Sequence, residues 1–308
     1  MISCTDFIPA YSEMFRYLED NYGRAEIDNY WRTMFKPGGG SPLVNFVEKE
    51  GIKGCFTYWK GTLNEEAAHF TMYLNEKRGF FKLVMHRCPS KGKLIDLRDQ
   101  IGLEPYHDYC LHCDGYRAAV EKVGLEYIYD FTNMDNAGCS ILIYDPKIFD
   151  GRVIMDEDTL IMERNAADNE YFHPSFHFSL SRGMHYVGEH YGEQGVRDVM
   201  SRYVDNVIKP LMGQITLDGI EAKIRADYAK EKCPDAVELT RTADGLQVTV
   251  KYCPGIKYMT DHDMWQSSWF RYTTEGVMAR MAELAGCSFV MDRYDEVTGA
   301  AQYRFVKK

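Results

Sequence analysis

The sequence lacks the features that mark three large classes of protein. None of its apolar runs approaches the roughly 20 residues needed to span a bilayer, so we expect no membrane segment. Residues 1–7 show neither the basic stretch nor the apolar core of a secretory signal, and we therefore expect a cytoplasmic protein. A net charge of −10, with no Lys/Arg cluster, argues against nucleic acid as a partner. These absences favour a small molecule.

A nucleotide-binding loop is also missing. The segment Lys36–Pro42 is rich in glycine, but it lacks the Gly-Lys-Ser/Thr sequence of a phosphate-binding loop. We expect a flexible loop between helices at this position, and no nucleotide cofactor.

The chain does have the length and the thiols for chemistry. Its 308 residues suffice for two domains of ordinary size, which can fold without disulfide bonds. Its cysteines number nine, which is odd, and residues 1–7 show no export signal, so we expect reduced thiols. Some of these thiols are then candidates for metal binding or catalysis.

Three short segments recur in the same order, at offsets of 169, 165 and 162 residues. The pairs are Tyr17–Gly23 with Tyr186–Gly192, Val84–Pro89 with Val248–Pro254, and Glu121–Asp130 with Glu283–Asp292. Self-similarity at this spacing predicts two diverged tandem copies of one module, related by a pseudo-two-fold axis. We place the first copy at residues 1–150 and the second at 170–308, with a polar linker at 151–169.

Alternating apolar residues and turn sequences predict the strands of each copy. In the first copy we expect a hairpin at 69–86 and a closing strand at 140–144. In the second copy we expect a hairpin at 236–252 and a closing strand at 301–306. With helices before and between the strands, this order predicts an α+β fold in which each module has an antiparallel sheet with helices on one face.

A dense group of cysteines and histidines lies in the first copy, at His86, Cys88, His107, Cys110, His112, Cys113 and Cys139. Cys110 and Cys113 form a Cys-x2-Cys pair, a spacing that directs two soft ligands at one ion. With Cys88 and His86 as further ligands, the group predicts a site for a divalent metal, for which zinc is the first choice.

The same group also fits a thiol nucleophile. Cys110 or Cys113 would then lie at a helix N-terminus, with His107 or His112 as the general base. A third interpretation treats these residues as ordinary buried side chains. The second copy has no Cys-x2-Cys, since the aromatic segment Trp265–Tyr272 takes its place, so we expect the working site in the first copy.

Other polar groups predict less. The histidines His173, His177, His185 and His190 suggest a helix surface or an interface, because their spacing is poor for one metal. The acidic pair Glu65-Glu66 could supply acid/base groups, but such a pair is more typical of a solvated face.

Several of these short motifs together resemble the L-2-amino-thiazoline-4-carboxylic acid hydrolase family and the related four-vinyl-reductase-type small-molecule domains. The matching residues are Cys88-Pro89, Tyr109–Cys113, Gly124–Tyr127 and Gly138-Cys139 in the first copy, and Tyr191–Gly195, Cys253-Pro254 and Gly286 in the second. The resemblance implies a hydrolase that opens a small heterocycle. The chain departs from it in being duplicated and in having Ala301 where the first copy has Cys139.

We therefore expect a hydrolase that opens a small cyclic compound at a C–N or C–C bond. Cys110 and Cys113 would act as nucleophile or metal ligands, and His107 or His112 would move protons. The alternative is a non-catalytic small-molecule binding or sensor module with a structural zinc. A dithiol redox protein and a homodimer are further expectations that the sequence leaves open.

Overall fold

The computed structural model describes residues 1–35, 42–165 and 170–308, which divide between two compact units. The first-sheet unit comprises residues 22–173. The second-sheet unit combines residues 1–21 with residues 174–308. The units thus have other boundaries than the predicted copies, because the first 21 residues pack with the C-terminal half of the chain. The predicted flexible loop at 36–41 lies outside the described residues.

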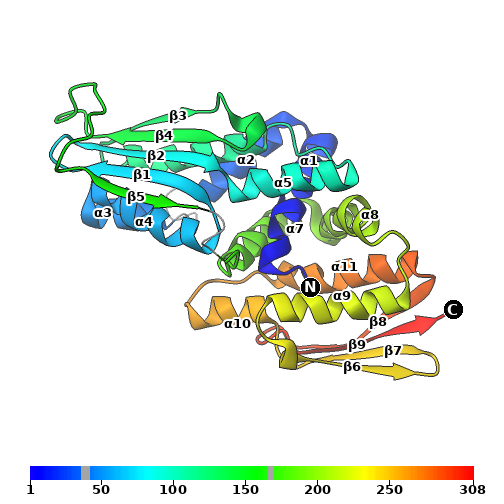
Figure 1. The fold of residues 1–308 in the computed structure, drawn as a ribbon. Helices are drawn as coiled ribbons and strands as arrows, with labels where there is room; N and C mark the ends of the chain where they lie inside the picture. The colour runs from blue at the N-terminus through cyan, green and yellow to red at the C-terminus, as the bar shows by residue number, and fades with distance from the viewer. Residues whose placement is uncertain (36–41, 166–169) are drawn as a thin grey trace. The chain divides into compact units, whose positions relative to one another are not determined.

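The first-sheet unit has one antiparallel sheet with the strand order β3-β4-β2-β1-β5 (Figure 1). Its strands are β1 (His69–Asn75), β2 (Phe80–Arg87), β3 (Glu126–Asp130), β4 (Cys139–Tyr144) and β5 (Leu160–Arg164). Its helices are α2 (Arg24–Phe35), α3 (Leu43–Glu50), α4 (Ile52–Glu65), α5 (Pro89–Ile101) and α6 (Arg117–Glu121), with 3-10 helices η2 (Tyr109–Tyr116) and η3 (Met134–Asn136).

The second-sheet unit has an antiparallel sheet with the strand order β6-β7-β9-β8. Its strands are β6 (Val237–Thr242), β7 (Gly245–Val250), β8 (Cys287–Tyr294) and β9 (Ala301–Lys307). Its longer helices are α1 (Phe7–Tyr22), α7 (Phe176–Tyr203), α9 (Leu217–Lys230), α10 (Pro254–Asp261) and α11 (Tyr272–Leu284). Shorter helical segments are η1 (Cys4–Asp6), η5 (Val204–Ile208), α8 (Lys209–Met212), η6 (Pro234–Ala236) and η7 (Ser268–Arg271).

The predicted α+β class with antiparallel sheets is confirmed. The hairpins predicted at 69–86 and 236–252 are the pairs β1–β2 and β6–β7. The closing strands predicted at 140–144 and 301–306 are β4 and β9. Within residues 1–35, 42–165 and 170–308, no helix is both long enough and apolar enough to cross a lipid bilayer.

The two sheets share one strand pattern. Strands β1-β2-β4-β3 of the first-sheet unit have the same order and antiparallel pairing as β6-β7-β9-β8 of the second. The recurring Tyr-to-Gly segments also share a backbone feature, since Gly23 and Gly192 have positive φ angles of 84° and 70° and interrupt helical runs. Both observations support the predicted duplication, which stays a prediction.

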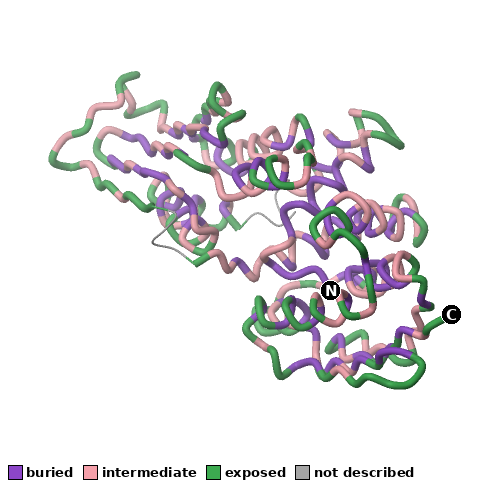
Figure 2. The backbone as a smooth tube through the Cα atoms, turned by 45° about the vertical axis from the view of Figure 1, so that its right-hand side comes forward, coloured by how far each residue is buried: buried purple, intermediate pink, exposed green. Residues whose placement is uncertain are grey.

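The core of the first-sheet unit lies between its sheet and helices α3, α4 and α6. On β2, Phe81, Leu83 and Met85 point into this core, while alternation turns His86 to the opposite face. The Trp59 ring of α4 stacks on the Phe81 ring with centroids 5.4 Å apart. Figure 2 shows buried stretches in purple, which alternate with intermediate ones in pink along strands such as β1 and β2. The inward face of β2 thus lies in the layer between the sheet and the helices, and Cys88 packs against the same layer.

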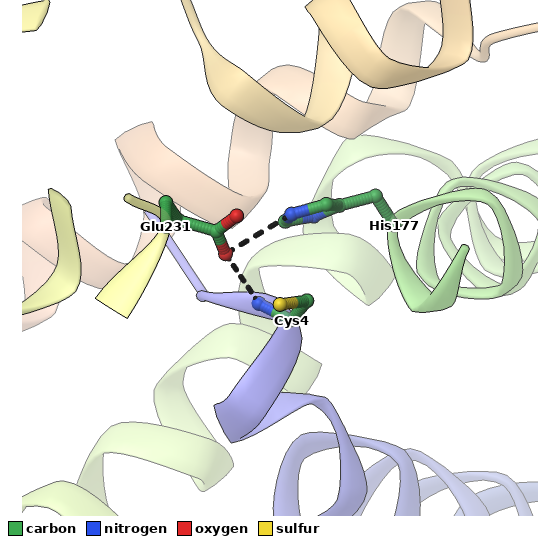
Figure 3. Close-up of side chains that lie close together, drawn as sticks. All are labelled: Cys4, His177 and Glu231. Carbon is green, nitrogen blue, oxygen red and sulfur yellow. Dashed lines mark hydrogen bonds and ion pairs between the residues drawn. The ribbon is translucent and has the colours of Figure 1, made fainter. Parts of the chain in front are cut away.

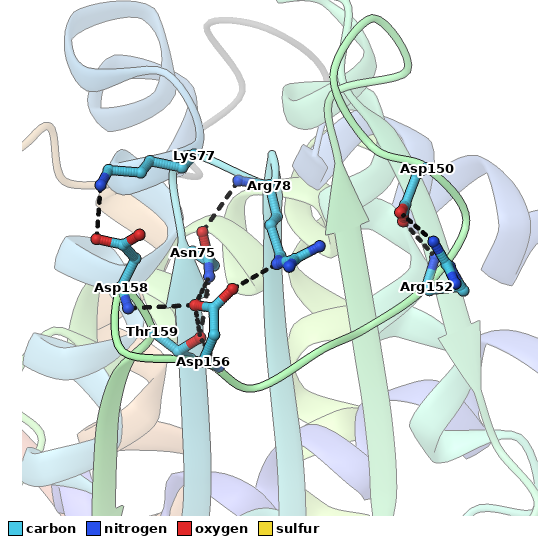
Figure 4. Close-up of polar contacts among 8 residues, drawn as sticks. All are labelled: Asn75, Lys77, Arg78, Asp150, Arg152, Asp156, Asp158 and Thr159. Carbon is cyan, nitrogen blue, oxygen red and sulfur yellow. Dashed lines mark hydrogen bonds and ion pairs between the residues drawn. The ribbon is translucent and has the colours of Figure 1, made fainter.

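Part of the predicted linker belongs to the first-sheet unit. Strand β5 pairs with β1, and the chain before it is tied to the β1–β2 turn (Figure 4). Asp156 is the centre of these contacts: it accepts hydrogen bonds from Asn75 at 2.7 Å and from Arg78 at 2.5 Å. Lys77 forms an ion pair with Asp158 at 2.7 Å. Residues 156–164 are therefore structural and extend the sheet.

Replacing Phe81 by Ala should destabilise the protein by about 3–5 kcal/mol, because it removes a fully buried ring and the stacking contact of that ring with Trp59. Urea unfolding measures this change. The matched control is Lys82→Ala, on the other face of the same strand, which should change the free energy of unfolding by less than about 1 kcal/mol. Equal losses for the two variants would contradict the assigned faces.

Candidate functional site

The candidate site is built around the 3-10 helix η2, which links α5 to α6. A 3-10 helix has three residues per turn, so side chains three positions apart lie on one face. Cys110, Cys113 and Tyr116 therefore share a face of η2. The helix lies close to Phe35, and a Cβ atom at Gly115 would come within 2.4 Å of the Phe35 ring. The Cys-x2-Cys spacing thus places two thiols on one face of η2, while its predicted role in binding one ion stays a prediction.

Two more cysteines approach this face from the sheet. Cys88 directly follows β2 and is the N-cap of α5. Its backbone N–H donates a hydrogen bond to Ala137 O at 2.7 Å. Cys139 begins β4 opposite Met85. The four side chains are half-buried and near enough to perturb one another electrostatically. We name Cys88, Cys110, Cys113 and Cys139 the thiol cluster.

Burial is the main influence on these thiols. It raises the pKa of Cys110 and Cys113 to about 12 and that of Cys139 to about 11. It also raises the pKa of Cys88 well above its ordinary value, and the three neighbouring thiols add to the effect. Without a compensating positive charge, the cluster is therefore protonated at neutral pH.

Cys113 has a base beside it. Its Sγ atom lies 3.6 Å from His112 Nε2, within hydrogen-bonding distance for sulfur. The other ring nitrogen, Nδ1, hydrogen-bonds to the backbone carbonyl of Tyr109. Because a carbonyl can only accept, Nδ1 carries the proton and Nε2 presents its lone pair to the thiol. Burial also lowers the pKa of His112 below 6.5, so the ring is neutral at pH 7.

Acidic and phenolic groups surround this pair. Glu66, at the end of α4, interacts electrostatically with both His112 and Cys113, and burial raises the pKa of its carboxyl group. His173 Nε2 lies 3.8 Å from Glu66 Oε1. Tyr129 lies near enough to Cys113 and Cys139 to lower the pKa of both thiols, against the larger effect of burial. The site therefore combines a thiol, an imidazole, a carboxyl group and a phenol.

Two predicted site residues lie apart from this arrangement. His107 is 63% exposed, and its ring is tilted against that of Tyr106, with centroids 4.6 Å apart. His86 is on the outer face of the sheet, where its Nε2 is 2.8 Å from Thr71 Oγ1. Strand β2 ends at Arg87 and helix α5 begins at Pro89. Because of this change of direction, Cys88 packs against the core while His86 stays on the outer face of the sheet.

Of the predicted metal ligands, Cys88, Cys110 and Cys113 lie near one another, while His86 is on the other face of the sheet. Among the described residues, no three of Cys88, Cys110, Cys113 and His86 have ligand atoms that all lie within 4.8 Å of one another. A metal would require the thiols to draw together.

Three members of the site had no predicted role. Cys139 was included in the cysteine and histidine group and in the Gly138-Cys139 motif, but it was not named as a ligand or a nucleophile. Tyr129 faces the core by strand alternation and gave no separate signal. Glu66 was expected on a solvated face, but its side chain is only 15% exposed.

The second histidine group also differs from expectation. His173 and His177 are 6% and 1% exposed and face carboxylates, whereas a surface position was predicted. His190 is exposed on α7 and His185 is half-buried there, in agreement with the prediction.

Comparison of the chain with protein-family models, with curated proteins and with solved structures finds no match.

Proposed function

We propose that the protein is a thiol-dependent hydrolase of a small cyclic compound, with Cys113 as nucleophile and His112 as general base. The observation that carries this proposal is the 3.6 Å contact between Cys113 Sγ and His112 Nε2, together with the bond from Nδ1 to Tyr109 O. A nucleophile within reach of a base that a third group orients is the usual arrangement of thiol and hydroxyl hydrolases. Of the four candidate catalytic residues, this geometry favours Cys113 and His112 over Cys110 and His107.

The reaction begins with attack of the Cys113 sulfur on the electrophilic ring carbon. As the S–C bond forms, the thiol proton moves to His112 Nε2, and it then passes to the ring nitrogen as the C–N bond breaks. Water next attacks the sulfur-bound carbon. It gives a proton to His112, the S–C bond breaks, and the proton returns to Cys113. Atoms and charge balance over the cycle, and the net change is hydrolysis of one C–N bond.

The protonated state of the cluster explains why a base is needed. A thiol with a pKa of about 12 supplies almost no thiolate at pH 7. Neutral His112 removes the proton during attack, so that no free charge has to form in a half-buried site. The Tyr129 hydroxyl favours the developing negative charge on sulfur. The substrate class, a small heterocycle such as a thiazoline, rests on the family resemblance.

The small ester p-nitrophenyl acetate serves as a substrate-independent probe. The wild-type protein should transfer the acetyl group to Cys113, detected by peptide mass spectrometry. Cys113→Ala should abolish transfer to this segment, and His112→Gln should slow it about 100-fold or more, since it removes the base. His107→Ala is the matched control and should acetylate at the wild-type rate. Unchanged acetylation of Cys113 in His112→Gln would refute the assigned base.

The pH dependence of this acetylation separates base-assisted attack from attack by free thiolate. With His112 as base, the rate should be nearly flat from pH 7 to 9, because the imidazole is already neutral and the thiol pKa lies near 12. In His112→Gln the rate should rise about tenfold per pH unit, as the thiolate fraction does. A tenfold rise per unit in the wild-type protein would contradict the mechanism.

A second candidate function follows from the gathering of four thiols. Cysteine thiolates are preferred zinc ligands, and a bound cation would reverse the burial effect that keeps the cluster protonated. The protein would then be a small-molecule binding module whose first-sheet unit is stabilised by zinc. Because Cys88, Cys110, Cys113 and Cys139 would close the coordination shell, no position would remain for a reacting water.

Metal analysis separates these two functions. For the binding module, protein purified without added metal should contain about one more equivalent of zinc than its Cys110→Ala, Cys113→Ala variant. Chelation should also lower the unfolding temperature of the wild-type protein but not that of the variant. Equal zinc in both proteins would rule out the thiol cluster as a metal site and leave the hydrolase as the remaining proposal.

A further inference from the structure

A separate group of metal-ligating side chains is buried in the second-sheet unit. Cys4 comes from η1, His177 from the first turn of α7, and Glu231 from the end of α9 (Figure 3). Each offers one ligand atom, and these atoms all lie within 4.8 Å of one another. The three residues are 1%, 1% and 7% exposed. The group thus joins three distant segments of the chain inside one core.

The carboxylate of Glu231 is the centre of the group. Its Oε1 atom accepts a hydrogen bond from the Cys4 backbone N–H at 2.5 Å and lies 3.1 Å from His177 Nε2. The Cys4 thiol also donates to this carboxylate. The contacts with His177 and Cys4 outweigh burial and lower the pKa of Glu231. A negative charge is therefore held in the core at neutral pH.

The imidazole of His177 is not fully satisfied by hydrogen bonds. Its Nδ1 atom is buried and has no hydrogen-bond partner among the described residues. The ring lies against the start of α10, where a Cβ atom at position 255 would come within 2.7 Å of Nδ1. Only Gly255 leaves room for the ring there. Leaving a buried polar atom without a partner is destabilising, so hydrogen bonding alone does not account for this arrangement.

We infer that Cys4, His177 and Glu231 bind a divalent transition-metal ion, with zinc as the best match. Thiolate, imidazole and carboxylate are the three zinc ligand types, and ligand atoms around one zinc lie roughly 3–4 Å apart. The 3.1 Å separation of His177 Nε2 and Glu231 Oε1 already fits this spacing. Binding releases the Cys4 proton, so that two negative ligands neutralise the ion within the core.

The first-sheet unit provides an internal comparison. There Glu66 directly follows α4 and precedes β1, just as Glu231 follows α9 and precedes β6, and it also faces an imidazole, His173 at 3.8 Å. Yet Cys4, His177 and Glu231 are the one group of three such ligands within 4.8 Å that the described part of the chain contains. The thiol that completes the group is therefore particular to the second-sheet unit.

Cobalt(II) is the probe, because a thiolate bound to cobalt gives a charge-transfer absorption band. The full chain is used with Cys110→Ser and Cys113→Ser, which removes the competing Cys-x2-Cys pair. This protein should develop the band with one equivalent of cobalt and lose it when zinc is added. Zinc at about 100 times its dissociation constant should raise the unfolding temperature by about 5 °C or more.

Two further variants in this background locate the site. Adding Cys4→Ser should remove the band and the zinc-dependent rise in unfolding temperature. Adding Cys287→Ser, at another buried cysteine of the same unit, should leave both intact. A band that persists in Cys4→Ser overturns the inference. If Cys4→Ser does not fold, the background protein decides alone, since no band and no temperature rise there also overturn it.

Discussion

The three-residue period of the 3-10 helix η2 is the constraint on which the candidate site depends. This period places Cys110 and Cys113 on one face, next to Cys88 and Cys139 from the sheet. In an α-helix, with 3.6 residues per turn, the two side chains would still share a face but would point about 60° apart, so the 3-10 helix aligns them more closely. The same short helix brings the His112 ring back to the Tyr109 carbonyl, which fixes the tautomer of the base.

Burial and base assistance act in opposite directions at this site. Loss of solvent keeps the four thiols protonated, which protects them from adventitious oxidation by lowering the thiolate fraction. Within the described part of the chain, Cys113 is the member of the thiol cluster with a hydrogen-bonding contact to an imidazole, that of His112 Nε2. This contact distinguishes Cys113, as the candidate nucleophile, from the other three cysteines of the thiol cluster. Metal binding would use the same thiols differently, by supplying a positive charge in place of a base.

Much of the fold followed from local patterns in the sequence. Alternation with a period of two and the turn before Gly245 predicted the β6–β7 hairpin, and Cys-Pro predicted where β2 gives way to α5. The position of His86 was misjudged because Cys88 no longer follows the alternation of the strand once the helix begins. Such changes of direction depend on how the chain packs, which local patterns do not encode.

The domain boundary and the second metal-ligand group could not be predicted for a related reason. Residues 1–21 pack with residues 174–308, and Cys4 meets Glu231 across 227 positions of sequence. No spacing rule connects residues that far apart. His177 was assigned to a surface because its neighbours in sequence carried no sign of the buried carboxylate. The recurrence of Glu66 and Glu231 after corresponding helices is visible only once both sheets are aligned.

We propose that Cys113 is the nucleophile because His112 acts as its general base. The most direct test is time-resolved alkylation of the metal-free wild-type protein by iodoacetamide at pH 7, with mass-spectrometric mapping of all nine cysteines. Burial raises the pKa of both Cys110 and Cys113 to about 12, and His112 lies beside Cys113, so we expect the base to set the difference between them. The account predicts that Cys113 is modified well before Cys110. Equal rates, or faster modification of Cys110, would contradict it.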